Sequence, residues 1–370
     1  PEVNDKAVLS YLEDENTYFE TALAPVKNLK DKIFEELKGR LKQDDESVPV
    51  KDGDWLYWWK FEPGAQYRNW WRRPKDGGDE QLLLSETKRA EGHDFYQLGA
   101  IAVSPDGQYL AISEDRQGDE RFQILIRPID GEDWTILAEG ANPNIIWDAS
   151  AKGLFYVELS EQHRPYLVHH LPIDGTDSTA IYQESDDAFF VGISRTKSRA
   201  SLIISAGDHI TSEARLMPLN QPGATPTLIS KRRHGHEYDV DHGNDQLFIR
   251  TNDTHRNFRI VTASPSAPGP DVWREMVAPS DENYIRGISV FADMLVVEER
   301  LNGLDQIAVH PHNGEGFHHV AFDEESYTTS LGANPEYQTD VLRLSYQSMV
   351  TPTSTLAVSY THLRAHETIR

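Results

Sequence analysis

The sequence predicts a mainly β protein: a seven-bladed β-propeller with a truncated last blade, preceded by an α-helical arm. The main observation is a leucine-centred strand pattern that returns seven times. Its leucines are Leu56, Leu110, Leu154, Leu202, Leu247, Leu295 and Leu342. Successive leucines are 54, 44, 48, 45, 48 and 47 residues apart. A period of about 40–50 residues in a strand-rich chain indicates one propeller blade per repeat.

Residues 1–46 are predicted to form the helical arm. The first apolar stripe, with the spacing of one helical face, consists of Ala7, Val8, Tyr11 and Leu12. Pro25 either breaks this helix or begins a second one, because proline is tolerated in the first turn of a helix. The second stripe consists of Leu29, Ile33, Phe34 and Leu37. Both stripes need a surface to pack against, either the propeller or a partner domain.

Residues 47–357 are predicted to form the propeller, because the apolar spacing changes toward the two-residue period of strands. The expected strands of the first blade are Asp54–Phe61, Gln66–Arg73 and Gln81–Ser85. Those of the second are Ala100–Ser104, Tyr109–Glu114, Phe122–Pro128 and Thr135–Ala138. Between two of them, Ser104-Pro105-Asp106-Gly107 is typical of a tight turn, since proline presets φ and glycine accepts a positive φ.

The end of the chain departs from the repeat. The seventh blade is expected to begin near Tyr327 and to supply Val341–Gln347 and Ser354–Val358. A complete blade needs roughly another 15–25 residues, so the last blade is predicted to be truncated. Residues 358–370 lack alternation and are predicted to be a non-native tail that resembles translated adapter sequence. A genuine frayed terminus is the alternative.

Composition disfavours several classes of partner. The 370 residues include 60 acidic and 36 basic ones, a formal charge of −24, so nucleic acid is not an expected partner. Without cysteine the chain has neither a disulfide nor a thiol nucleophile. No apolar run approaches the roughly 18–20 residues of a membrane span, and no secretory signal opens the chain. We therefore expect no membrane partner and a cytoplasmic location, although Pro1 indicates an incomplete N-terminus that could have carried a signal.

The sequence contains no catalytic constellation. A nucleophile elbow, Gly-x-Ser-x-Gly, is absent. The nearest fragments, Gly192-Ile193-Ser194 and Gly287-Ile288-Ser289, lie in predicted first strands of blades and are expected to be structural. Glycine-rich phosphate loops are absent as well. The predicted sets of catalytic, cofactor-binding and metal-binding residues are therefore empty, and no cofactor is expected.

Two histidine groups and one aromatic group are candidate sites. The first group is His234, His236 and His242, with Glu237, Asp239 and Asp241 between them. The second is His310, His312, His318 and His319, around an expected turn at Asn313-Gly314. His-x-His on a strand places two imidazoles on one face, but neither group has a second set of ligands, so structural roles are favoured. The aromatic group is Trp58, Trp59, Trp70 and Trp71, for which packing between blades is favoured over a binding platform.

The order and spacing of short motifs resemble the prolyl oligopeptidase family of serine peptidases, and within it the oligopeptidase B branch. The first-blade hairpin Tyr57–Tyr67 (YWWKFEPGAQY) carries much of the resemblance, with Trp58-Trp59-Lys60 where the branch usually has Tyr-Thr-Arg. The other motifs lie at residues 11–18, 35–40, 91–94, 103–107, 163–166, 211–213, 237–240, 249–253, 331–335 and 346–352. The resemblance covers roughly residues 2–357 without a large gap.

The resemblance implies a seven-bladed propeller that caps an α/β-hydrolase domain, which is absent from this chain. It implies cleavage of short peptides after Arg or Lys by a Ser-Asp-His triad on that domain, with the propeller restricting access. The expected partners are short peptides with basic residues and the hydrolase domain itself. A stand-alone propeller that serves as a binding scaffold, without catalytic activity, is the alternative.

Overall fold

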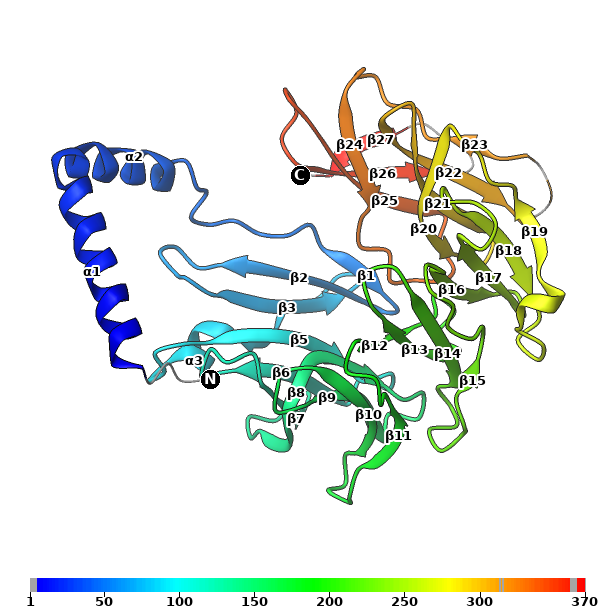
Figure 1. Cartoon of the computed structure of the whole chain (residues 1–370), viewed down its shortest axis with the longest axis horizontal. Helices are drawn as coiled ribbons and strands as arrows, with labels where there is room; N and C mark the ends of the chain where they lie inside the picture. Colours follow the sequence, from blue (N-terminus) through cyan, green and yellow to red (C-terminus); the bar gives the residue numbers. More distant parts are fainter. Residues whose placement is uncertain (1–4, 313, 315, 360–364, 370) are drawn as a thin grey trace.

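The computed structural model confirms the two parts expected from the sequence, a helical arm and a β-propeller (Figure 1). It describes residues 5–312, 314, 316–359 and 365–369. The arm consists of α1 (Lys6–Leu23), the 3-10 turn η1 (Ala24–Val26) and α2 (Lys27–Gly39). Asp5 caps α1 by accepting a hydrogen bond from the backbone N–H of Ala7 at 2.8 Å. Pro25 lies in η1, between the helices that it was expected to separate.

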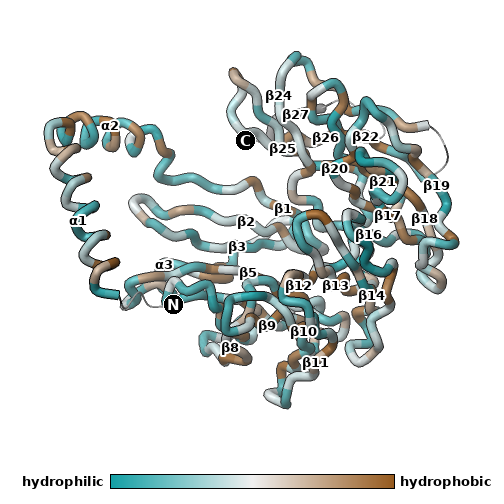
Figure 2. Tube along the Cα trace, viewed as in Figure 1, coloured by the Kyte–Doolittle hydropathy of each residue, from teal (hydrophilic) through white to brown (hydrophobic). Residues whose placement is uncertain are grey.

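Neither α1 nor α2 buries a residue. Both helices extend away from the sheets (Figure 1), and hydrophobic residues alternate with hydrophilic ones along them (Figure 2). The amphipathic pattern is therefore present as predicted, but its apolar stripes remain exposed.

The described strands form antiparallel sheets in which strands follow one another in sequence order. The first sheet holds β1 (Val50–Asp52), β2 (Trp55–Phe61), β3 (Arg68–Pro74) and β4 (Gln81–Ser85), followed by α3 (Glu86–Ala90). The next holds β5 (Gln97–Val103), β6 (Tyr109–Asp115), β7 (Phe122–Pro128), β8 (Thr135–Trp147), β9 (Gly153–Leu159), β10 (Pro165–Pro172) and β11 (Thr179–Gln183).

Four further sheets complete the propeller, each with four strands. The first of these holds β12 (Phe190–Arg195), β13 (Ser201–Gly207), β14 (Ser212–Pro218) and β15 (Thr227–Leu228). The next holds β16 (Tyr238–Gly243), β17 (Gln246–Thr251), β18 (Arg259–Ala263) and β19 (Arg274–Val277), with the 3-10 turn η2 (Pro270–Val272). The third holds β20 (Asn283–Val290), β21 (Met294–Leu301), β22 (Leu304–Pro311) and β23 (His318–His319). The last holds β24 (Tyr327–Leu331), β25 (Val341–Ser348), β26 (Ser354–Ser359) and β27 (Ala365–Ile369).

The prediction of seven separate blades is wrong. In the described part of the chain, five sheets are separate four-stranded blades, and one seven-stranded sheet occupies the place of the expected second and third blades. The cause is β8, which pairs with β7 through its first half and with β9 through its second half. Ala141 pairs with both neighbours and so joins the two halves into one strand, although the register with β9 shifts between Ala141 and Ile145.

The last sheet also differs from expectation. It has four strands, so the predicted truncation of the last blade is wrong in strand number. The fourth strand, β27, lies within the segment expected to be a tail and pairs with β26 through Thr355↔Ile369 and Leu356↔Thr368.

The predicted tight turn between β5 and β6 is confirmed. Gly107 has φ +73°, and its N–H donates to the carbonyl of Ser104 at 2.9 Å. The Asp106 carboxylate accepts from the Ser104 hydroxyl at 2.6 Å. The turn thereby sets the register of the two strands that carry Leu110 and its neighbours.

Candidate functional site

The order of the strands defines two faces of the propeller. The chain enters β1 directly from the arm, and strands alternate in direction within each sheet. Connections between second and third strands therefore lie on the side where the chain enters, which we call the arm-side face. Connections between first and second strands lie on the opposite side, the far face. Binding and catalytic residues are found disproportionately on the loops that a rigid scaffold positions, so the loops at these two faces are the candidate sites.

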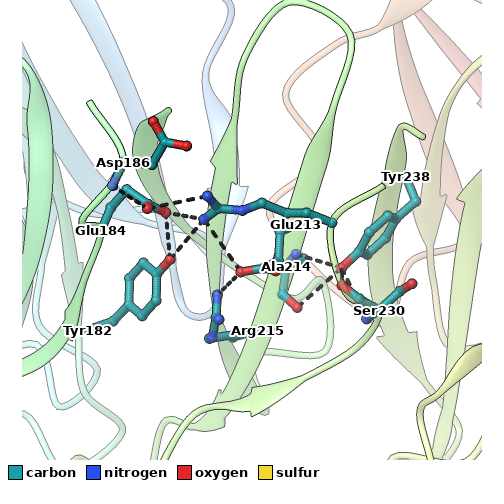
Figure 3. A network of polar contacts seen from close by, with 9 residues as sticks. Tyr182, Glu184, Asp186, Glu213, Ala214, Arg215, Ser230 and Tyr238 are labelled. Carbon is teal, nitrogen blue, oxygen red and sulfur yellow. Dashed lines mark hydrogen bonds and ion pairs between the residues drawn. The ribbon is translucent and has the colours of Figure 1, made fainter. Parts of the chain in front are cut away.

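On the arm-side face, a polar network joins two neighbouring sheets (Figure 3). Glu184 follows β11, and its carboxylate accepts hydrogen bonds from the Tyr182 hydroxyl at 2.8 Å and from the N–H of Asp186 at 2.9 Å. Arg232, which follows β15, donates to both oxygens of Glu184. The same guanidinium lies 3.6 Å from Glu213 of β14. Arg232 thus holds two carboxylates from different sheets.

This network is held in its charged form. Burial raises the pKa of Glu184, but hydrogen bonds from Arg232, Asp186 and Tyr182 outweigh it and leave the pKa below its ordinary value. Burial and the hydrogen bond to Glu184 raise the pKa of Tyr182 to about 12. At neutral pH the tyrosine is therefore a donor and the carboxylate an acceptor.

Tyr238, at the start of β16, extends the contacts to the next sheet (Figure 3). Its hydroxyl accepts from the N–H of Ala214 at 2.7 Å and donates to the carbonyl of Ser230 at 2.8 Å. The side chain is 3% exposed, so both backbone groups depend on this hydroxyl rather than on water.

Similar acid–arginine pairs recur on the arm-side face. Glu114 accepts from Arg89, Asp253 from Arg259, and Asp305 from Arg286 and Arg300. Glu299 pairs with His319 instead. These carboxylates are largely buried and neutralised by their partners, so they hold strand ends together. Within the described residues, no group of three or more His, Cys, Asp or Glu side chains is arranged to hold a metal ion.

The first histidine group does not converge. His236 is 4% exposed, and its Nε2 lies 2.9 Å from the Thr251 hydroxyl. Burial lowers the pKa of His236, which favours the neutral ring. His242, in β16, lies 2.8 Å through Nδ1 from the Ser198 hydroxyl of the previous sheet, whereas His234 is exposed. Asp241 accepts from three backbone N–H groups, those of Lys197, His242 and Val290, each at 2.8 Å.

The second histidine group lies along β22 and β23 without a common centre. His312 contacts the carbonyl of Phe291 at 3.1 Å, and His319 contacts Glu299. His310 stacks on Phe317 with ring centroids 4.8 Å apart, and burial lowers its pKa. The expected turn at Asn313-Gly314 lies partly outside the described residues.

The tryptophans and the elbow-like fragments have structural settings. Trp70 packs against the apolar cluster between the first and second sheets, as predicted, and its Nε1 donates to Glu86 at 2.7 Å. Trp59 and Trp71 instead lie under the cations of Arg68 and Lys60, at 4.4 and 4.1 Å. Gly192-Ile193-Ser194 and Gly287-Ile288-Ser289 lie in β12 and β20, the first strands of their sheets, where they were expected.

The comparisons with known proteins agree with this architecture. A model of the prolyl oligopeptidase N-terminal β-propeller domain matches residues 2–365. The chain belongs to the prolyl oligopeptidase family. The resemblance deduced from the sequence motifs is thereby confirmed. None of the described helices of this family member is long and apolar enough to span a membrane.

Two curated relatives match nearly the whole chain. Dipeptidyl aminopeptidase BI of Pseudoxanthomonas mexicana is 35% identical over 96% of this chain and 52% of its own length. Protease 2 of Moraxella lacunata is 28% identical over 95% of this chain and 52% of its own length. The chain therefore spans about half the length of these relatives.

Solved structures of oligopeptidase B share the fold. The enzyme from Leishmania major superposes with a TM-score of 0.91 and 26% identity, over 99% of this chain and 54% of its own. The enzyme from Trypanosoma brucei, in a closed form with covalently bound antipain, gives a TM-score of 0.88 and 28% identity. That match covers all of this chain and 55% of the other.

Proposed function

We propose that this chain is the propeller portion of a serine-type oligopeptidase that cleaves short peptides after Arg or Lys. The observation that carries the proposal is the match of almost the entire chain to one half of peptidases about twice as long. The proposed reaction is acyl transfer through a serine, with His as the general base and Asp orienting it, all in a catalytic domain outside residues 1–370.

In this proposal the propeller excludes folded substrates and orients short ones. The acid–arginine pairs, such as Glu184 with Arg232, fix the strand ends on the arm-side face. Rigid strand ends limit which peptide substrates can pass the propeller and reach a catalytic domain that covers this face. The apolar stripes of α1 and α2, which bury nothing here, would pack against the catalytic domain. The cytoplasmic location expected from the sequence is part of the same proposal.

The excess of acidic over basic residues in the chain supports the proposed preference for basic peptides. A formal charge of −24 attracts cationic peptides, and such steering weakens with salt. We expect kcat/KM for an arginine peptide to fall as ionic strength rises, and a value insensitive to salt would contradict this part of the proposal.

A second activity is favoured by one relative. Dipeptidyl aminopeptidase BI, at 35% identity, carries a name that implies release of dipeptides from a free N-terminus. Both activities share the acyl-transfer chemistry and differ in whether the substrate needs a free amine two residues before the cleaved bond.

The experiment has two steps. Sequencing the source DNA beyond codon 357 will show whether the frame continues into Gly-x-Ser-x-Gly followed by Asp and His. The protein encoded by that longer frame is then assayed with fluorogenic peptides that carry Arg or Ala before the cleaved bond, each with a free and a blocked N-terminus.

Cleavage of both arginine peptides supports the oligopeptidase proposal, whereas cleavage only of the unblocked peptides supports the dipeptidyl activity. A series of arginine peptides of increasing length, ending with a folded protein, tests exclusion by the propeller. Equal rates across the series would contradict the gating role. A stop codon in place of the catalytic domain would favour the binding scaffold.

A further inference from the structure

The junctions between sheets are apolar with one exception. Buried clusters join the first sheet to the second, the two halves of the seven-stranded sheet, and each later sheet to its successor. Among the described residues, no such cluster joins the last sheet to the first. The first and last sheets meet through the contacts of Lys51 with Glu336 and of Arg343 with Pro49, and we call this junction the seam.

Polar contacts and a cavity take the place of a core at the seam. Lys51 of β1 pairs with Glu336 at 2.9 Å, and Arg343 of β25 donates to the carbonyl of Pro49 at 2.6 Å. A cavity of about 510 Å³ lies between them, with Leu56 of β2 and Ala357 of β26 among its lining residues. Direct contact between the first and last sheets is therefore polar and incompletely packed.

The loop Gly332–Asp340, between β24 and β25, reaches sheets that are not its neighbours. In a ring, the last sheet adjoins only the β20–β23 sheet and the first sheet. Yet Lys197, which follows β12, donates through Nζ to the carbonyl of Asn334. The N–H of Asn244, which follows β16, donates to the Tyr337 hydroxyl at 3.0 Å. Such contacts require the loop to cross the centre of the ring on the far face.

Arg199 links three sheets at once. Its Nη2 donates to the carbonyl of Pro335 at 3.1 Å and to the Asp52 carboxylate at 2.5 Å. Pro335 belongs to the loop of the last sheet, Asp52 to β1, and Arg199 to the turn between β12 and β13. The turn between β12 and β13 therefore contacts both sheets that meet at the seam.

The anchors of this loop are themselves fixed. Asp241 accepts from the N–H of Lys197 and, through its other oxygen, from the N–H of Val290. The Lys197 ammonium also lies 4.5 Å from the centre of the Phe291 ring. The loop therefore binds a prearranged surface made by the β12–β15, β16–β19 and β20–β23 sheets.

We propose that the loop Gly332–Asp340 is a clasp that closes the ring from across its centre. Lys197 and Arg199 are its anchoring residues, and they hold the seam shut from the opposite side of the propeller. The inference goes beyond the proposed peptidase function and does not depend on it.

A thiol in the seam cavity tests the clasp, because the chain has no cysteine of its own. Ala357→Cys places a half-buried thiol there, and its rate of reaction with a maleimide reports opening of the seam. We expect Lys197→Met or Arg199→Gln to raise this rate about tenfold, the effect of losing one charge-assisted hydrogen bond in an opening equilibrium. Lys231→Met is the matched control, because Lys231 is an exposed lysine that follows β15 of the same sheet, and it should leave the labelling rate unchanged.

Ala224→Cys, at a partly buried residue against another junction, separates seam opening from general loosening. Faster labelling of the thiol at 357 alone supports the clasp. An unchanged rate at 357 in both anchor variants would overturn it, and so would equal acceleration at 224 and 357.

Discussion

The guanidinium of Arg343 in β25 donates to the carbonyl of Pro49, at 2.6 Å, across the seam between the last and first sheets. The partners are 294 residues apart in sequence, and a second nitrogen of the same group lies 3.5 Å from the carbonyl of Val48. Arg343→Met should lower the free energy of unfolding by about 1–3 kcal/mol, because the carbonyls lose a charged donor. Urea unfolding measures this, and Arg256→Met, at an exposed arginine, should change little.

The hydroxyl of Tyr238 gives a second prediction. It binds the backbone of Ala214 and Ser230 in a site closed to water. Tyr238→Phe should cost about 1–3 kcal/mol, since the buried groups lose their partner while the ring is kept. Tyr284→Phe is the control, because Tyr284 is 41% exposed. Equal unfolding midpoints for the Tyr238 variant and the parent would contradict the role given to this hydroxyl.

Stability should depend on Glu184 in acid. The pKa of this group is lower in the fold than its ordinary value, so its contribution is complete above the unfolded pKa of about 4.3. The contribution is lost as the pH falls through the folded pKa. Glu184→Gln should be less stable at pH 7 and should lose less stability on acidification, measured by urea unfolding at a series of pH values. Glu161→Gln, at an exposed position, should follow the parent curve.

Gly243 tests the packing beneath the clasp. A Cβ on this residue would lie 2.5 Å from Cγ1 of Val290 and 2.8 Å from the Tyr337 hydroxyl. Gly243→Ala should therefore destabilise the fold by about 1–3 kcal/mol, as overpacking of a close contact does. Gly223→Ala is the matched control, because nothing lies within 4 Å of its added Cβ. Hydrogen exchange in the loop Gly332–Asp340 should increase only in the Gly243 variant.

Local patterns in the sequence predicted local structure well. The leucines of the repeat lie in second strands such as β6 and β13, and the turn at Gly107 formed as its residues require. The junction within β8 was not predicted, because the expected strand ended at Ala138. Ala141 nevertheless pairs with strands on both sides. The alternation of apolar and polar residues indicates where a strand lies, but it does not reveal whether that strand pairs with strands of two neighbouring blades.

The polar networks could not be predicted for a different reason. Lys197 and Asn334 are 137 residues apart, and Asn244 and Tyr337 are 93 apart, so no spacing within one repeat relates them. Arg232 and Glu184 belong to successive repeats, and a charge on a strand end does not reveal its partner. The histidines cluster in sequence but not in space, and of two that are only two residues apart, His234 is exposed and His236 is buried.

The exposed arm gives the last prediction. Ile33 and Phe34 of α2 are 48% and 60% exposed, and neither helix of the arm buries any residue. An apolar stripe of this extent favours association, so we expect the 370-residue chain to elute from a sizing column as concentration-dependent oligomers. Ile33→Glu with Phe34→Glu should shift the chain toward a monomer, because the new charges interrupt the stripe.

Ser10→Glu with Asn28→Glu is the control for added charge, since it adds the same two negative charges at exposed arm residues outside both apolar stripes. If both double variants dissociated the oligomers equally, charge rather than the apolar stripe would drive association. In a longer protein that carries a catalytic domain, the Ile33 and Phe34 variant should instead lower stability, because the stripe would then be covered. A monodisperse monomer of the parent chain that melts cooperatively would contradict the need of the arm for a partner surface.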